Sequence, residues 1–132
     1  MVKGRRGLGE RGELAAKAYL QALGYRILLE NYTTPAGEVD LIAKDGEVLV
    51  FVEVKARSSS GYGPPEAAVT PWKQRQIARA AERYLLEAGL KETACRFDVV
   101  AVTFSSDEGS PQITLIKDAF WMERRLTPPR RR

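Results

Sequence analysis

The stretch GEVDLIAKDGEVLVFVEVK, Gly37–Lys55, decides the fold of this chain because it predicts a β-hairpin. Asp45-Gly46 at its centre is a two-residue turn signal, since both central residues of a type I′ turn require positive φ. The residues on either side are rich in valine, isoleucine, leucine and phenylalanine, which favour strands. We therefore work outward from a hairpin centred on this turn.

The turn also predicts the register of the two strands. It places Phe51 opposite Asp40 and Glu53 opposite Glu38, so that Glu53 lies diagonal to Asp40 at roughly 7–8 Å between Cα atoms. Like charges directly opposite one another destabilise a sheet. We therefore expect a cation beside Glu38 and Glu53, either the ammonium group of Lys55 or a metal ion.

The side chains of the hairpin separate into two faces, because they alternate along each strand. One face is wholly apolar and is expected to lie in the core: Val39, Leu41, Ala43, Val48, Val50, Val52 and Val54. The other face is apolar near the turn, but its far end gathers three carboxylates and a lysine: Glu38, Asp40, Glu53 and Lys55. This acidic end is the sharpest functional feature of the sequence.

The rest of the chain predicts further helices and strands in a simple order. Helices are expected over residues 8–23 and 70–88, strands over 25–32, 96–104 and 112–117 (the last at a sheet edge), and a final helical turn over 119–126. The element order is α-β-β-β-α-β-β. Its natural packing is an α/β domain with a central mixed sheet of about five strands flanked by helices.

Length and charge define the class of protein further. With 132 residues, the chain 1–132 is expected to form one domain, with residues 1–7 and 127–132 as flexible basic tails. Of the net charge of +4, residues 1–11 carry +3 and the last five residues another +3, which leaves −2 for the rest. Basic ends suit a polyanionic partner such as nucleic acid, although solvated ends without a partner have the same composition.

The residues that are missing or rare exclude several kinds of chemistry. The chain has no histidine, which excludes His-based triads, His zinc sites and Cys-His pairs. Its one cysteine, Cys95, fits a reducing cytoplasm, and we expect a cytoplasmic protein with no signal peptide and no membrane span. Acid–base chemistry at neutral pH must then come from carboxylates, lysine or metal-bound water.

Asp40, Glu53 and Lys55 form the pattern D-x12-E-x-K on two neighbouring strands. Oxygen ligands without histidine or cysteine suit Mg²⁺ or Mn²⁺, and such an ion acidifies a water for attack on a phosphodiester. The main-chain carbonyl of Val54 is a further candidate ligand, and Lys55 would stabilise charge that develops in the transition state. The competing interpretation is an ordinary ion-pair network on an exposed sheet face.

Basic and polar residues around this pattern are candidates for contacts with nucleic acid: Arg57, Tyr62, Lys73, Gln74, Arg75 and Arg79. Arg75 and Arg79 continue to Arg83 as a basic stripe on the second helix. Tyr62 lies in a loop of small residues, 58–65, that is either a plain surface loop or a flap over substrate in which Tyr62 stacks on a base.

Glu13 on the first helix has two interpretations. It is either a surface partner of Lys17 at i+4 or a carboxylate aimed at the hairpin site. Spacing alone favours the salt bridge with Lys17.

Several motifs, in order, resemble the YraN-like small bacterial proteins: Gly9–Glu13, Gly37–Ile42, Val50–Arg57, the helix with Lys73, and Arg96–Val100. That family is placed in the PD-(D/E)XK nuclease superfamily, near the archaeal Holliday-junction resolvases, which are dimeric Mg²⁺-dependent enzymes. The resemblance implies that Asp40, Glu53 and Lys55 form the nuclease triad and that Glu13 assists metal binding. Val39 stands where the superfamily name has proline, but only the aspartate is a ligand.

The resemblance implies a metal-dependent DNA endonuclease that acts on branched or recombining DNA. It also implies a homodimer, since a resolvase cuts two opposed strands. A helicase or recombination protein is a candidate partner, and a helicase would recruit the protein if it is an adaptor. The main alternative is a non-catalytic DNA-binding or adaptor module, and a weaker one is an RNA-processing nuclease.

Overall fold

The computed structural model describes residues 7–58, 63, 65–90, 92–105 and 110–120. Within these ranges the elements are α1 (Leu8–Ala22), β1 (Arg26–Thr34), β2 (Gly37–Asp45), β3 (Val48–Arg57), the 3₁₀ helix η1 (Pro65–Ala68), α2 (Pro71–Ala88), β4 (Cys95–Thr103) and β5 (Gln112–Phe120). The predicted single α/β domain, with its order α-β-β-β-α-β-β and five-stranded mixed sheet, is confirmed. The predicted tails, apart from Gly7, lie outside the described residues.

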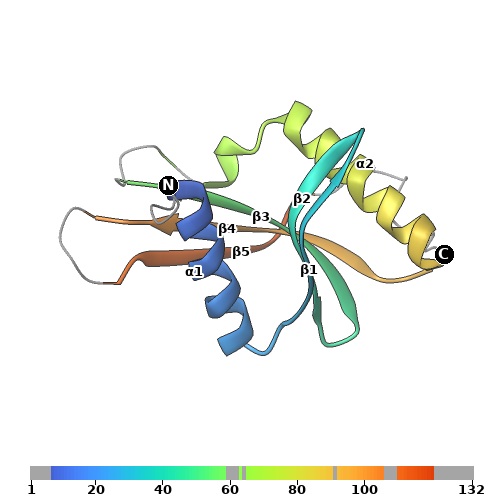
Figure 1. The fold of residues 1–132 in the computed structure, drawn as a ribbon, viewed down its shortest axis with the longest axis horizontal. Coiled ribbons are helices and arrows are strands. Elements are labelled where there is room, and N and C mark those ends of the chain that lie inside the picture. Colours follow the sequence, from blue (N-terminus) through green and yellow to red (C-terminus); the bar gives the residue numbers. More distant parts are fainter. Residues whose placement is uncertain (1–6, 59–62, 64, 91, 106–109, 121–132) are drawn as a thin grey trace, which may run out of the picture.

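The sheet has the order β1-β2-β3-β4-β5, with β3 and β4 parallel and the other neighbours antiparallel. The connection from β3 to β4 runs through α2, as a parallel pair requires. The helices α1 and α2 lie on opposite faces of the sheet, each over its own apolar cluster (Figure 1). Neither of these described helices is long and apolar enough to cross a membrane.

The predicted hairpin register is wrong by two residues. The structure pairs Leu41 with Val52 and Asp45 with Val48, so the turn residues are Gly46 and Glu47. Asp45 stays in the strand, where its carboxylate accepts a hydrogen bond of 2.9 Å from Arg96. Because a shift of two residues preserves the alternation, most of the predicted faces survive: Leu41, Ala43, Val50, Val52 and Val54 all lie in the cluster on the α1 side.

Two further expectations require correction. Val39 is buried, but it packs on the α2 side with Ile42 and not with Leu41, so its side chain does not follow the alternation of the strand. The predicted helical turn is wrong at Ala119 and Phe120, which belong to β5. Phe120 pairs with Phe97 and stacks on its ring at 5.0 Å, which keeps the chain extended. The remainder of that predicted turn lies outside the described residues.

Gly12 allows α1 to approach the sheet closely and so fixes the position of its neighbour Glu13. A Cβ atom at Gly12 would lie 2.6 Å from the Cβ atom of Ala56 on β3. We expect Gly12→Ala to lower the free energy of unfolding by about 1–3 kcal/mol, the usual cost of overpacking. Gly9→Ala on the same helix, where a Cβ meets nothing within 4 Å, is the control and should be neutral or stabilising. Urea denaturation checks this, and equal losses in both variants would contradict it.

Candidate functional site

Asp40 and Glu53 meet at the point where β2 and β3 stop pairing. Both strands continue past Leu41 and Val52, but the ladder between them ends there. Beyond it, the main-chain N–H of Val54 donates to the Asp40 carboxylate at 2.8 Å. Asp40 thus replaces a main-chain acceptor of the missing ladder, and its side chain also shares a hydrogen bond with Glu53. The corrected register therefore brings Asp40, and not Glu38, beside Glu53.

This carboxylate pair combines a buried Glu53 with a half-buried Asp40 and is electrostatically unfavourable when both groups are charged. Glu53 is 5% exposed. Burial, followed by the charge of Asp40, raises the pKa of Glu53 to about 8, against the opposing effects of Lys73 and Lys55. Burial also raises the pKa of Asp40, although the hydrogen bond from Val54 acts in the opposite direction. The pair therefore binds a proton near neutral pH unless a cation takes its place.

Two lysines from different elements approach the same oxygen of Glu53. The ammonium nitrogen of Lys55 on β3 lies 3.9 Å from Oε2, and that of Lys73 on α2 lies 4.0 Å from it. Lys73 stands in the first turn of α2, where its main-chain N–H donates to the N-cap Thr70. The sequence indicated Lys55 for this place, but it assigned Lys73 only to nucleic acid. The distances are long for ion pairs, so both ammonium groups remain available to a substrate phosphate.

Glu13 faces the site and does not pair with Lys17. Lys17 instead bonds Glu30 on β1 at 2.6 Å, so the salt bridge favoured by spacing is not formed. Burial, followed by the charge of Asp40, raises the pKa of Glu13, whereas a side-chain hydrogen bond with Asn31 lowers it. Asn31 has a left-handed φ of 53°, a conformation that asparagine tolerates better than most residues. Sequence reasoning missed Asn31, since a lone asparagine in a strand segment carries no functional signal.

The donor set suits a hard divalent cation. Among the described residues, no group of three or more His, Cys, Asp or Glu side chains is close enough to hold a metal ion. Mg²⁺ needs only one or two carboxylates, because it keeps several of its waters. The Asp40–Glu53 pair supplies these oxygens, and its two adjacent carboxylates have cationic partners only at 3.9 and 4.0 Å, which fits such an ion. Glu13 and the carbonyl of Val54 remain predicted ligands.

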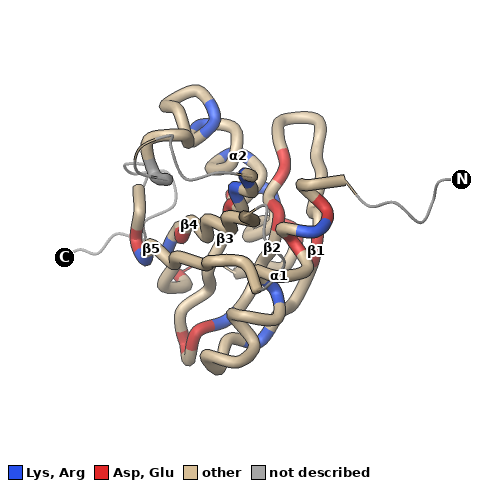
Figure 2. The backbone as a smooth tube through the Cα atoms, turned by 90° about the vertical axis from the view of Figure 1, so that its left-hand side faces the viewer, with Lys and Arg blue, Asp and Glu red and all other residues tan. Residues whose placement is uncertain are grey.

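The predicted nucleic-acid contacts fall into two groups. Arg75 and Arg79 are exposed on α2, and basic segments of this helix lie near acidic segments of the central strands (Figure 2). Gln74 and Arg57 already have main-chain partners: Gln74 donates to Val69 at 2.9 Å, and Arg57 donates to Gly63 at 3.2 Å. Tyr62 lies outside the described residues.

A second buried acid, Asp98 on β4, belongs to the scaffold. It is 0% exposed and accepts hydrogen bonds from the Tyr25 hydroxyl, the Arg96 guanidinium and the main-chain N–H of Asp118. Arg96 also bonds Asp45, which links β4 to the end of β2. Sequence reasoning gave this residue no role, although an aspartate within an apolar strand is itself a sign of a paired buried charge.

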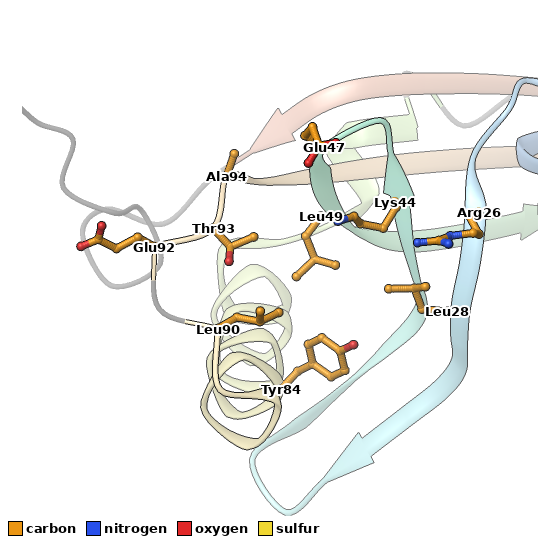
Figure 3. A pocket seen from close by; sticks show the side chains of 10 residues that line it. All are labelled: Arg26, Leu28, Lys44, Glu47, Leu49, Tyr84, Leu90, Glu92, Thr93 and Ala94. Carbon is orange, nitrogen blue, oxygen red and sulfur yellow. The ribbon is translucent and has the colours of Figure 1, made fainter.

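A cavity of about 450 Å³ lies beside the turn of the β2–β3 hairpin, between the strands and the end of α2. Figure 3 shows Arg26 and Lys44 from β1 and β2 on one side of it, and Tyr84 and Leu90 from α2 and the residues after it below. Its lining includes neither Asp40 nor Glu53. This cavity is therefore separate from the carboxylate pair.

Comparison with known proteins gives a consistent result. The model of the uncharacterised protein family UPF0102 matches residues 12–102, which include Glu13, Asp40, Glu53 and Lys55. The chain is 51% identical to the UPF0102 protein of Geobacter sulfurreducens over 86% of this chain and 88% of that protein. It is 51% identical to the UPF0102 protein of Symbiobacterium thermophilum over 87% of this chain and 97% of that protein. It is 45% identical to the UPF0102 protein of Moorella thermoacetica over 91% of this chain and 100% of that protein.

Proposed function

This chain belongs to the uncharacterised protein family UPF0102, and we propose that it is a metal-dependent endonuclease that hydrolyses DNA phosphodiester bonds. The observation that carries the proposal is the pair of the half-buried Asp40 and the buried Glu53, with Lys55 and Lys73 beside it. In an ion-pair network with a purely structural role, each carboxylate would lie within hydrogen-bond distance of a lysine or arginine. Here the two acids contact each other and the ammonium groups stand at 3.9 and 4.0 Å.

Asp40 and Glu53 would hold Mg²⁺ or Mn²⁺, which supplies an acidified water and polarises the phosphate when it is bound. Lys55 and Lys73 would place their ammonium groups toward the non-bridging oxygens of the phosphate, where negative charge increases during attack. Glu13, whose pKa is raised by burial and by the nearby charge of Asp40, would orient water on the α1 side. The hydrogen bond from Val54 fixes Asp40, so this residue needs little rearrangement to bind the cation.

The cationic groups outside the site suit a phosphate backbone, and the resemblance to the YraN-like family favours DNA as the polymer. Arg75 and Arg79 are exposed on α2, and both ends of the chain are basic. Such contacts give affinity without reading base sequence. From the resemblance to the YraN-like family, we infer branched or recombining DNA as substrate and a homodimer that cuts two opposed strands. We further propose a cytoplasmic location, which the single Cys95 fits, and a helicase or recombination protein as partner.

Cleavage of labelled four-way junction, duplex and single-stranded DNA in Mg²⁺, Mn²⁺ or EDTA tests this proposal. We expect metal-dependent cutting, and we expect Asp40→Asn to lower its rate about 1,000-fold. The substitution removes a charged oxygen ligand, and such a loss raises the activation barrier by about 4 kcal/mol. Asparagine keeps an acceptor for Val54, so the fold should persist. Glu47→Gln changes an exposed acid in the turn of the same hairpin and should cut as the wild type does.

A non-catalytic DNA-binding or adaptor module is the second candidate. The specific observation in its favour is that no third acid joins the pair closely enough to complete a metal site among the described residues. DNA binding without cleavage in any metal, unchanged by Asp40→Asn, would establish the adaptor and overturn the nuclease.

A further inference from the structure

An exposed tryptophan stands beside the candidate site. Trp72, in the first turn of α2, is 61% exposed although tryptophan is one of the largest apolar side chains. It directly precedes Lys73, whose ammonium group reaches Glu53 at 4.0 Å. Neighbouring Cα atoms are about 3.8 Å apart, so the indole ring is attached to the backbone next to a lysine of the candidate site.

The position of Trp72 on the helix connects it to the exposed arginines. Trp72, Arg75 and Arg79 are spaced i, i+3 and i+7, which places them on one face of α2. All three are exposed, whereas the opposite face buries Ile77, Ala80 and Ala81. Lys73 turns from that exposed face toward Glu53. The outer face of α2 therefore carries an aromatic ring followed by two guanidinium groups and begins at the site.

This combination suits a strand of nucleic acid with exposed bases. Proteins that hold unpaired nucleotides combine cations along the backbone with aromatic rings on which bases stack. In a continuous duplex the faces of the bases are covered by their neighbours, so an aromatic side chain has no base to stack on. An exposed tryptophan that does not bind a partner merely leaves apolar surface in water.

We propose that Trp72 stacks on an unpaired base next to the phosphate that Lys55 and Lys73 contact beside Glu53, while Arg75 and Arg79 follow the backbone. The substrate class is then DNA with unpaired nucleotides at the cleavage point, such as a splayed arm or an overhang, and not continuous duplex. This inference rests on the proposed nuclease function and names its substrate.

Binding in EDTA tests the inference without cleavage. Fluorescence anisotropy should show that the wild-type protein binds a labelled duplex with a single-stranded arm more tightly than the same duplex without the arm. Trp72→Ala should weaken binding to the armed DNA about 10-fold or more and binding to the duplex less than about 2-fold, since stacking acts only on unpaired bases. Trp72→Phe, which keeps a ring, should retain most of the preference. The chain has one other tryptophan, Trp121, which Trp121→Phe removes so that the fluorescence comes from Trp72 alone. In this variant, the duplex with the single-stranded arm should quench the emission of Trp72.

Leu86→Ala is the matched control, because Leu86 is 76% exposed on α2 at the far end of the helix. It should bind both DNAs as the wild type does. Equal weakening on both DNAs, or no weakening in Trp72→Ala, would overturn the stacking role while leaving a nuclease in place. A wild-type protein that binds neither DNA would overturn the proposed function itself and the inference with it.

Discussion

Glu53→Gln is expected to abolish metal-dependent cleavage and to stabilise the metal-free protein at neutral pH. Burial and the charge of Asp40 raise the pKa of Glu53 to about 8 from an ordinary value of 4.5. The charged form of Glu53 therefore lowers the stability of the folded state. The contribution of Glu53 to wild-type stability should be greatest below about pH 4.5 and should fall as the pH rises through 8, because the folded protein holds a proton at Glu53 that the unfolded chain releases.

Glutamine has the shape of a protonated glutamate and removes this penalty. Each pKa unit corresponds to about 1.4 kcal/mol, and coupling with Asp40 and relaxation reduce the effect, so we expect a gain of about 1–3 kcal/mol at pH 7. The gain should vanish near pH 4. Urea denaturation in EDTA from pH 4 to 9 measures it. Glu38→Gln is the control, because Glu38 is an exposed acid near Asp40 on the same strand, and its substitution should change the free energy of unfolding less. A gain that does not vary with pH would show that it does not arise from the protonation of Glu53.

Mg²⁺ should reverse the order of stability. A cation that binds only the folded protein stabilises it by mass action, and the wild type keeps both carboxylates for that ion. The melting temperature of the wild type should therefore rise with Mg²⁺, whereas that of Glu53→Gln should stay constant. Cleavage by the variant should fall about 1,000-fold or more. Full cleavage by Glu53→Gln would remove this residue from the mechanism, whatever its effect on stability.

The acidic end of the hairpin was predictable because it depends only on alternation. Asp40 on β2 and Glu53 and Lys55 on β3 are expected on one face in both registers, because a register shift of two residues preserves the alternation between faces. The register itself was not predictable, because Asp45-Gly46 and Gly46-Glu47 both contain the glycine that adopts a φ of 64°. Arg96, 51 residues from Asp45 in sequence, bonds it within the strand, and no local pattern contains that contact.

The remaining parts of the site depend on how the helices lie over the sheet. The approach of Lys73 to Glu53 requires the position of α2, and the choice of Lys17 between Glu13 and Glu30 requires the position of α1 against β1. The resemblance to the YraN-like family indicated Glu13 where spacing indicated otherwise. The exposure of Trp72 is likewise invisible in the sequence, since a tryptophan in an amphipathic helix is normally expected in the core.

Asp98→Ala is expected to cause a large loss of stability without any direct effect on the candidate site. The carboxylate is 0% exposed and accepts four hydrogen bonds, from Tyr25, from two nitrogens of Arg96 and from the N–H of Asp118. Its removal leaves the guanidinium of Arg96, 16% exposed, without its buried partner. It also leaves the N–H of Asp118 without an acceptor, at an irregularity where φ is 54°.

Breaking one side of a buried ion pair typically costs 3–5 kcal/mol, and we expect a loss of about this size for Asp98→Ala. Asp98→Asn keeps the shape and some acceptors and should cost less, about 1–3 kcal/mol. Asp118→Asn is the control, because it retains the main-chain N–H and a residue type that tolerates positive φ. Urea denaturation at pH 7 measures all three.

The hydrogen-bond partners of Asp98 are Tyr25, Arg96 and Asp118, and none of these belongs to the candidate site. The folded fraction of Asp98→Asn should therefore cleave DNA at the wild-type rate. A folded but inactive Asp98→Asn protein would show that the network acts on the site and not only on the scaffold.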